Sequence, residues 1–161
     1  MKLDETDLKI LTLLQKQGRI TNSQLAAEAG ISPPAMLERV KRLENAGVIE
    51  GYTAIINPDK VGCGTTALVW VSLAAHRTAS FESFAREIRK LPEVLECHHI
   101  AGEEDFVLKV VVRNIQEYED FVLNKLTPIP GVGKIKTTFI LSSLKNSTEL
   151  PIRRFSGGSD S

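Results

Sequence analysis

The sequence has little cysteine, and it lacks the long apolar runs of membrane proteins. Only two cysteines, Cys63 and Cys97, occur in 161 residues. Two thiols are too few for a disulfide framework or a four-thiolate zinc site, so we expect both to be reduced. No apolar run is long enough to span a bilayer, and residues 1–13 contain no cleavable signal pattern. We therefore expect a cytoplasmic protein with no membrane partner.

The chain also has no excess of charge of either sign. Twenty Lys and Arg residues balance twenty Asp and Glu residues, for a formal net charge of +0. A strongly basic domain would by itself indicate nucleic-acid binding, and this chain contains none, because residues 1–60 are balanced as well. Any contact with DNA must therefore come from a local cluster of Lys and Arg side chains, which oligomerisation would repeat.

Recognisable catalytic and metal-binding motifs are missing too. No Ser/His/Asp or Cys/His arrangement matches a known nucleophilic site. Cys97, His98 and His99 are adjacent, and His76 lies elsewhere. On a regular strand His98 and His99 would point to opposite faces and could not both bind one ion. We therefore expect no enzyme activity, no metal and no cofactor.

Two short helical patterns, separated by a tight turn, occupy residues 21–47. A capping box that starts at Thr21 begins the first helix, and Gly30 stands where a helix ends in a left-handed residue. Ser32 caps the second helix, and Pro33 takes its first position, where a missing N–H costs nothing.

The second helical pattern has a buried stripe and a basic outer face. Met36, Val40 and Leu43 recur at i, i+4 and i+7 and predict the buried side. The opposite face carries Pro34, Ala35, Glu38, Lys41, Arg42 and Asn45, with Arg39 at its edge. This is the helix-turn-helix arrangement of DNA-binding proteins. A two-helix piece of another helical domain is the alternative for this stretch taken alone.

A third helix is expected from Asp4 to Gln17, and an extended segment follows residue 47. The helix has Leu8, Leu11 and Leu14 on one side, and its first turn is acidic, as the helix dipole favours. The β-prone residues 49–56 indicate an extended linker or a wing-like strand, which could pair with the same strand of a second subunit.

From residue 65 the pattern changes to strand, helix, strand, strand, helix, strand. This order is that of a ferredoxin-like split βαβ unit, with two helices on one face of an antiparallel sheet. Ser80 and Asn114 are the expected helix caps. The first strand, from Thr65, is apolar on both faces, so we expect the face without helices to form a dimer interface.

These patterns predict an α+β chain with an N-terminal trihelical (winged-like) helix-turn-helix domain and a C-terminal ferredoxin-like βαββαβ domain. The expected boundaries are 1–48 for the helix-turn-helix domain, 49–62 for a short extended linker, 63–145 for the ferredoxin-like domain and 146–161 for a tail. The tail is polar, rich in Gly and Ser and without periodicity, which is typical of a mobile end.

Five runs match the order and spacing of one known family: LDETDLKIL, GRITNSQLAAEAGIS, LERVKRLENAGVIEGYTAIINP, AGEEDF and IPGV. With them the chain, from Leu3 to about Leu144, resembles the leucine-responsive regulatory protein/AsnC family of bacterial and archaeal transcription regulators. The resemblance implies a sequence-specific DNA-binding regulator that forms dimers and often octamers of dimers. It further implies wrapping or bending of DNA, and assembly or activity that responds to a bound amino acid.

The DNA contacts expected from the helix-turn-helix lie on two helix starts. Ser32, Pro34 and Ala35 should be nearest the base edges, and because they are small, DNA shape should contribute to sequence choice. The outer face of the second helix adds expected phosphate contacts at Arg39, Lys41 and Arg42 and includes Glu38. Arg39 could equally bridge to an acid within the domain. The preceding helix start, whose N–H groups can hold a phosphate, comprises Arg19, Thr21, Asn22 and Ser23.

The resemblance places an effector near a Gly-x-x-Asp turn, here Gly102 and Asp105, at the interface between dimers. Backbone N–H groups of the turn would bind a carboxylate and Asp105 an ammonium, although a purely turn-forming Asp is the alternative. Phe106 keeps the family's aromatic after Asp. Two pairs of residues complete the expected set: Glu103 and Glu104, which could favour a basic ligand or be solvated, and Thr137 and Thr138, which match a strand position near the pocket or reflect β-propensity.

Two other functions remain open from the sequence. The first is an enzyme similar to the haem-biosynthesis decarboxylases that share this two-domain architecture. The second is an architectural protein that compacts DNA without an effector.

Overall fold

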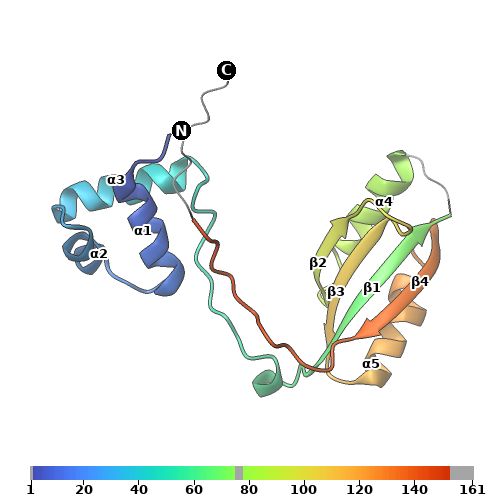
Figure 1. Cartoon of the computed structure of the whole chain (residues 1–161). Coiled ribbons are helices and arrows are strands. Elements are labelled where there is room, and N and C mark those ends of the chain that lie inside the picture. Colours follow the sequence, from blue (N-terminus) through green and yellow to red (C-terminus); the bar gives the residue numbers. More distant parts are fainter. Residues whose placement is uncertain (1, 75–77, 153–161) are drawn as a thin grey trace. The chain divides into compact units, whose positions relative to one another are not determined.

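The computed structural model describes residues 2–74 and 78–152, which form two compact units (Figure 1). The first unit comprises residues 2–55 together with 145–152, and the second comprises residues 56–144. No helix in these described ranges is both long enough and apolar enough to cross a membrane.

The first unit contains three helices in its described residues: α1 Glu5–Lys16, α2 Asn22–Ala29 and α3 Pro33–Asn45. Their starts confirm the expected caps. The hydroxyl of Thr21 accepts a hydrogen bond from Gln24 N at 3.2 Å, and Ser32 Oγ accepts one from Ala35 N at 3.4 Å. Gly30 has a φ of 73°, so the left-handed end of α2 is confirmed as well.

The core of this unit lies between the three helices. The stripe of α3 predicted from its spacing is buried, with Met36 and Leu43 both 0% exposed. Ile10 of α1 and Leu25 of α2 are also fully buried and pack in the same cluster. Each short helix thus covers the apolar face of the others, which none could bury alone.

Of the two alternatives for residues 49–56, the described chain has the extended linker, and no strand lies between α3 and the second unit. The segment is extended but has no ladder partner within one chain, and a short 3₁₀ turn, Asp59–Val61, follows it. Tyr52 is held to α3 by a hydrogen bond from its hydroxyl to Glu44 Oε1 at 3.0 Å.

Part of the expected mobile tail, 146–161, is docked on the first unit. Leu150 N donates to Gln15 Oε1 at 2.6 Å, and Gln15 Nε2 donates to Leu150 O at 3.3 Å. Ile152 packs against the helical core. With α1 and residues 48–52, this segment lines an apolar groove. Residues 153–161 lie outside the described residues.

The second unit is a ferredoxin-like βαββαβ fold, as predicted. Its strands are β1 Thr65–Leu73, β2 Val94–His99, β3 Phe106–Val112 and β4 Val132–Phe139, in the order β2-β3-β1-β4 with antiparallel neighbours. Two helical stretches, α4 Thr78–Ile88 and α5 Ile115–Asp120, connect them, and α5 continues as a π-helical segment, Phe121–Leu126.

The two expected caps of these helices differ in outcome. Asn114 caps α5 as predicted, because its side chain accepts a hydrogen bond from Glu117 N at 2.9 Å. Ser80 does not cap α4, because the helix begins at Thr78 and Ser80 lies inside its first turn. The apolar spacing fixes the helical face here but not the first residue of the helix.

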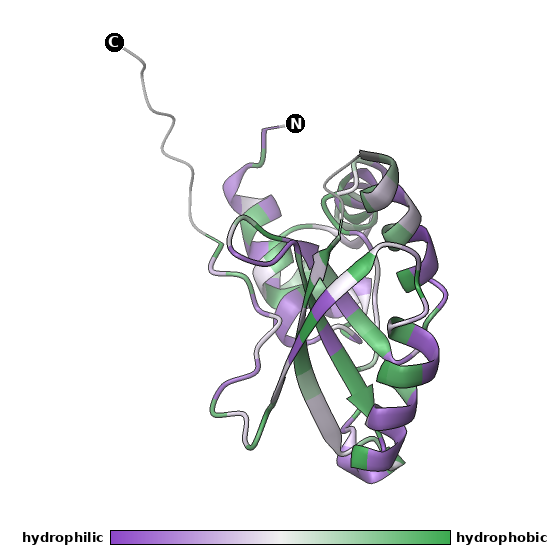
Figure 2. Ribbon diagram, turned by 90° about the vertical axis from the view of Figure 1, so that its right-hand side faces the viewer, coloured by the Kyte–Doolittle hydropathy of each residue, from purple (hydrophilic) through white to green (hydrophobic). Residues whose placement is uncertain are grey.

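Burial alternates along the two central strands, as their sequence predicts. Ala67, Val69, Val71 and Leu73 of β1 are buried against the helices, and so are alternate residues of β3 from Phe106 to Val112. Figure 2 shows both apolar (green) and hydrophilic (purple) stretches along the helices and strands. On the other face, Leu68 and Trp70 are half-buried in the single chain, which leaves an apolar sheet surface without helices.

Candidate DNA-binding and ligand-binding surfaces

The expected DNA-reading residues lie at two exposed helix starts. On α3, Ser32 and Pro34 are exposed and Ala35 is half-buried, while Glu38 and Lys41 are exposed further along. At the start of α2, the side chains expected to contact phosphate are all exposed: Arg19, Thr21, Asn22 and Ser23. The outer surface of the helix-turn-helix is thus accessible in the single chain.

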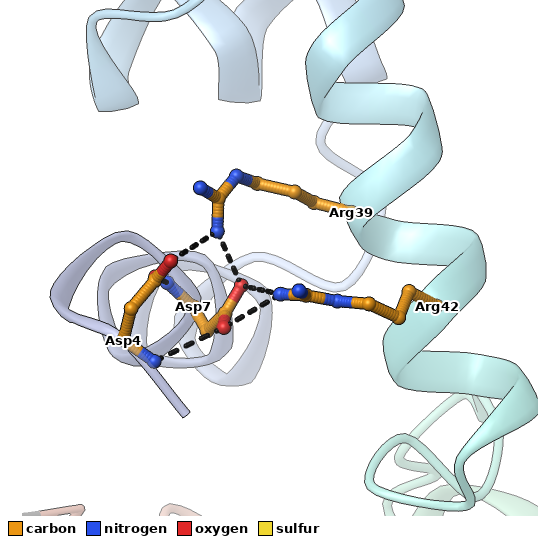
Figure 3. Close-up of polar contacts among 4 residues, drawn as sticks. All are labelled: Asp4, Asp7, Arg39 and Arg42. Carbon is orange, nitrogen blue, oxygen red and sulfur yellow. Dashed lines mark hydrogen bonds and ion pairs between the residues drawn. The ribbon is translucent and has the colours of Figure 1, made fainter. Parts of the chain in front are cut away.

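The two arginines of α3 bind carboxylates at the N-terminal end of α1, on its cap residue Asp4 and on Asp7 (Figure 3). Arg39 Nη1 lies 2.7 Å from Asp4 Oδ2 and 2.8 Å from Asp7 Oδ1. Arg42 Nη2 lies 2.7 Å from Asp7 Oδ1 and 2.7 Å from Asp7 Oδ2. Arg39 therefore forms an ion pair within the domain, which was one of the two alternatives for this residue.

Asp7 is the centre of this network, and its side chain is only 1% exposed. Its carboxylate also accepts a hydrogen bond from Asp4 N at 3.1 Å. At Asp4, the hydrogen bond from Arg39 and then that from the Asp7 N–H hold the pKa of the carboxyl below its usual value of 3.8. The network therefore fixes α3 against the N-terminus of α1.

Sequence reasoning missed the partnership of Asp7 with the arginines and assigned the acids of α1 to the helix dipole alone. A signal was available, because acids at 4 and 7 and arginines at 39 and 42 share the i, i+3 spacing of one helix face. Within the described chain, Lys41 is then the basic residue of α3 without an ion pair.

In the second unit, Asp105 fastens the Gly-x-x-Asp turn to β1. Asp105 Oδ2 accepts a hydrogen bond from Leu73 N at 2.7 Å, and Asp105 N donates to Val71 O at 3.1 Å. Asp105 O also accepts from Ile100 N at 2.9 Å. The structure therefore has Asp105 in the turn-forming role that was the alternative to ligand binding.

The acids of this turn differ in their surroundings. Gly102 and Glu103 are exposed. The side chain of Glu104 is 12% exposed, and its Oε1 lies 3.9 Å from Lys136 Nζ. The same ammonium lies 5.5 Å from the centroid of the Trp70 ring. A positive charge from β4 thus offsets the negative charge of Glu104 beside the turn.

The remaining expected effector residues lie on two faces of the sheet. Phe106 is 5% exposed and packs in the core, with its ring centroid 4.6 Å from that of Phe84. Thr137 points to the helices, where its hydroxyl bonds that of Tyr118. Thr138, one residue on, pairs with Leu68 and faces the side without helices. The structure therefore does not bring Thr137 and Thr138 to one surface.

The histidines of β2 point to opposite faces, as predicted. His99 pairs with Phe106 and stacks near Phe81, with 5.0 Å between ring centroids, whereas His98 lies 3.3 Å from Glu96 Oε2. No group of three or more potential metal ligands occurs among the described residues, and His76 lies outside them.

Both units match models of known protein families. Residues 66–150 match the model of the Lrp/AsnC ligand binding domain, and residues 3–50 match a winged helix-turn-helix DNA-binding model. The leucine-responsive regulatory protein of Rhizobium meliloti is 38% identical over 152 residues, covering 94% of this chain and 97% of its own. The transcriptional regulator AzlB of Bacillus subtilis is 35% identical over 150 residues, covering 93% and 96%.

Solved structures agree with this match. A transcriptional regulator from Neisseria meningitidis, solved as a complex with L-Met, has a TM-score of 0.89 and 38% identity, covering 93% of this chain and 97% of its own. An AsnC family transcriptional regulator from Agrobacterium tumefaciens has a TM-score of 0.87 and 30% identity, covering 92% and 97%. With its helix-turn-helix unit, its ferredoxin-like unit and these matches, the chain belongs to the Lrp/AsnC family of transcriptional regulators, which combine a DNA-binding helix-turn-helix with a ligand-binding domain.

Proposed function

We propose that this regulator recognises its operator by inserting the N-terminal half of α3 into the major groove. The observation that carries the proposal is the ion-pair network of Asp7, which fixes α3 on α1 while Ser32, Pro34 and Ala35 remain accessible. A rigid recognition helix loses little conformational entropy when it docks, so more of the contact energy appears as affinity.

Phosphate contacts should come mainly from Lys41 and from the start of α2, where Arg19 is exposed beside Thr21, Asn22 and Ser23. Arg39 and Arg42 would act first as positioning residues for α3. Each guanidinium has five N–H donors, and the side chain of Arg42 is 48% exposed, so it can face a phosphate while it binds Asp7.

The DNA proposal is tested by measuring affinity against salt. A fluorescently labelled duplex selected by the wild-type protein is titrated between 50 and 200 mM KCl, which we choose as the working range. Lys41→Ala should weaken binding to all duplexes alike and reduce the magnitude of the slope of log K against log[salt] by about 1. Lys134→Ala, at an exposed lysine of β4, is the matched control. Equal slopes of log K against log[salt] for the two variants would show that Lys41 does not contact a phosphate.

We also propose that the ligand of the second unit is an amino acid. The Neisseria relative was solved with L-Met, and several relatives are named leucine-responsive regulatory protein. The turn at 102–105 has backbone N–H groups for a carboxylate, and the acids Glu103, Glu104 and Asp105 are there for an ammonium. The Lys136 ammonium beside Glu104 reduces the local negative charge, which favours a neutral over a basic side chain on the ligand.

A thermal-shift series with each proteinogenic amino acid tests this ligand, because a ligand that binds the native state raises the melting temperature. A rise for one amino acid, lost in Asp105→Ala but kept in Glu87→Ala on α4, would support the turn as the site. Because Asp105 also bonds Leu73 N, the melting temperature of each ligand-free variant is the reference. A flat response to all of them would favour an architectural DNA-binding protein without an effector.

The apolar sheet face of the second unit supports a homodimer, which could assemble further into an octamer. Leu68 and Trp70 lie on that face and no helix covers them in one chain. A dimer would also place two α3 helices for paired half-sites on the duplex. A regulator acting on chromosomal DNA would work in the cytoplasm and needs no catalytic residues.

A further inference from the structure

Two stripes on the exposed surface of α3 differ in their contacts. One contains Ala35, Arg39 and Arg42, spaced at i, i+4 and i+7, and both of its arginines bind carboxylates of α1 (Figure 3). The other, which we call the groove stripe, is spaced at i, i+3, i+4 and i+7 and comprises Pro34, Leu37, Glu38 and Lys41. Because the arginines of the first stripe are held by carboxylates, the groove stripe, whose four side chains are all exposed, is better placed to read a base edge.

Leu37 gives the groove stripe an apolar part. Its side chain is 42% exposed and belongs to neither core cluster, although it lies one residue from the fully buried Met36. A single exposed leucine is ordinary on a protein surface, but this one stands beside the exposed Pro34 on a recognition helix. In the major groove, the 5-methyl group of thymine is the apolar group that such a surface can contact.

Glu38 gives the same stripe an acceptor. It is exposed and forms no ion pair in the described part of the chain, although Lys41 stands three residues away. Phosphates repel a carboxylate, so an acid on this side does not add general affinity for DNA. Its chemistry instead fits one base edge, because a carboxylate accepts a hydrogen bond from the N4 amino group of cytosine.

We propose that Leu37 and Glu38 are specificity-determining residues of this regulator. Leu37 contacts the 5-methyl group of a thymine, and Glu38 accepts a hydrogen bond from the N4 amino group of a cytosine in the same half-site. The proposal rests on the proposed entry of α3 into the major groove. It assigns sequence choice to side chains beyond the small residues Ser32, Pro34 and Ala35.

Leu37 is tested by removing the methyl group from the DNA. The full-length protein is first used to select its preferred duplex from a random library. Each thymine is then replaced singly by deoxyuridine, and Kd is measured by fluorescence anisotropy. At one position in each half-site, this replacement should raise the Kd of the wild-type protein about fourfold, which is the effect of losing one buried methyl-sized group. Leu37→Ala should bind the thymine and deoxyuridine duplexes equally at that position.

Glu38 is tested by repeating the selection with Glu38→Gln. A glutamine pairs with adenine N6 and N7, so one position per half-site should change from cytosine to adenine. Leu123→Ala, at a 59% exposed leucine of the second unit, is the control and should select the wild-type site. Circular dichroism should show all variants folded, because none of these side chains lies in a core.

Each assignment stands or falls on its own variant. Suppose that each replacement of a thymine by deoxyuridine costs the Leu37→Ala variant as much affinity as it costs the wild type. Leu37 then does not contact a thymine methyl group. If Glu38→Gln selects the wild-type base at every position, Glu38 does not read cytosine. A wild-type protein that selects no sequence at all would instead overturn the proposed docking of α3, and the two failures are thus distinguishable.

Discussion

Asp7 is a buried carboxylate that binds two arginines at once, and both arginines are more exposed than Asp7. The side chain of Asp7 is 1% exposed, while those of Arg39 and Arg42 are 29% and 48% exposed. Such a pairing compensates the cost of burying one charge, and the arginines can return to water if it is lost. The stability of the first unit should therefore depend on Asp7 far more than on Asp4.

We predict that Asp7→Asn lowers the free energy of unfolding of the first unit by about 2 kcal/mol, because two charge-assisted hydrogen-bonded contacts lose their acceptor charge. Asp4→Asn should cost less than about 1 kcal/mol, since Asp4 is half exposed and Asn also caps a helix. Urea unfolding followed by circular dichroism measures both. Equal losses for the two variants would contradict the central position of Asp7.

The pKa of Asp4 predicts acid sensitivity in the same network. Arg39 lowers the pKa of the folded-state carboxyl below 3.8, so the ionised form is favoured by folding. The resulting stability is present above pH 3.8 and is lost as the pH falls through the lower, folded-state pKa. The urea concentration at the unfolding midpoint is measured in steps from pH 5 downward. Below pH 3.8 it should fall more steeply for the wild type than for Asp4→Asn. Parallel curves would show that Asp4 does not contribute.

At the level of elements, the chain after β4 returns to α1 as a docked segment. Gln15 bonds both the N–H and the carbonyl of Leu150, and Ile152 packs on the helical core. This arrangement stabilises α1 from a distant part of the sequence, because half-burial of one isoleucine and two hydrogen bonds are added to the contacts of a small core.

We predict that a chain ending at Ser147 loses about 1–2 kcal/mol of unfolding free energy in its first unit. A chain ending at Ile152 keeps every described contact of the segment and is the matched control. Urea unfolding at a constant protein concentration compares the two with the full chain. If both shortened chains were as stable as the full chain, the docking of Leu150 and Ile152 would contribute nothing to the helical unit.

At the scale of the whole molecule, the apolar sheet face is the surface through which we propose that two chains associate. Leu68 lies on this face between Lys109 and Thr138, and no helix covers it. We predict that Leu68→Glu raises the dimer dissociation constant at least a hundredfold, because a carboxylate would lose its hydration at the interface and the neighbouring Lys109 is already paired with Glu96. Sedimentation equilibrium measures the change. Leu123→Glu, on the exposed π-helical segment, should leave the dimer intact. A dimer that tolerates both substitutions must use another surface.

The fold and its faces followed from local spacing. The i, i+4, i+7 recurrence of Met36, Val40 and Leu43 identified the buried side of α3, and the alternation in β1 and β3 identified the side that packs on the helices. These predictions succeeded because the direction of a side chain depends on the helical or strand period alone. The same period already requires Thr137 and Thr138 to point apart.

Only the tertiary structure decided which residues meet. The pairing of Asp7 with Arg39 and Arg42, the bond of Asp105 to Leu73 N and the docking of Leu150 on Gln15 all join residues more than thirty positions apart. The sequence determined the helices, the strands and the family, because those depend on local pattern and recognisable runs. The contacts of α3 depended on how the chain brings distant charges together, and this left Leu37 and Glu38 exposed on the helix surface.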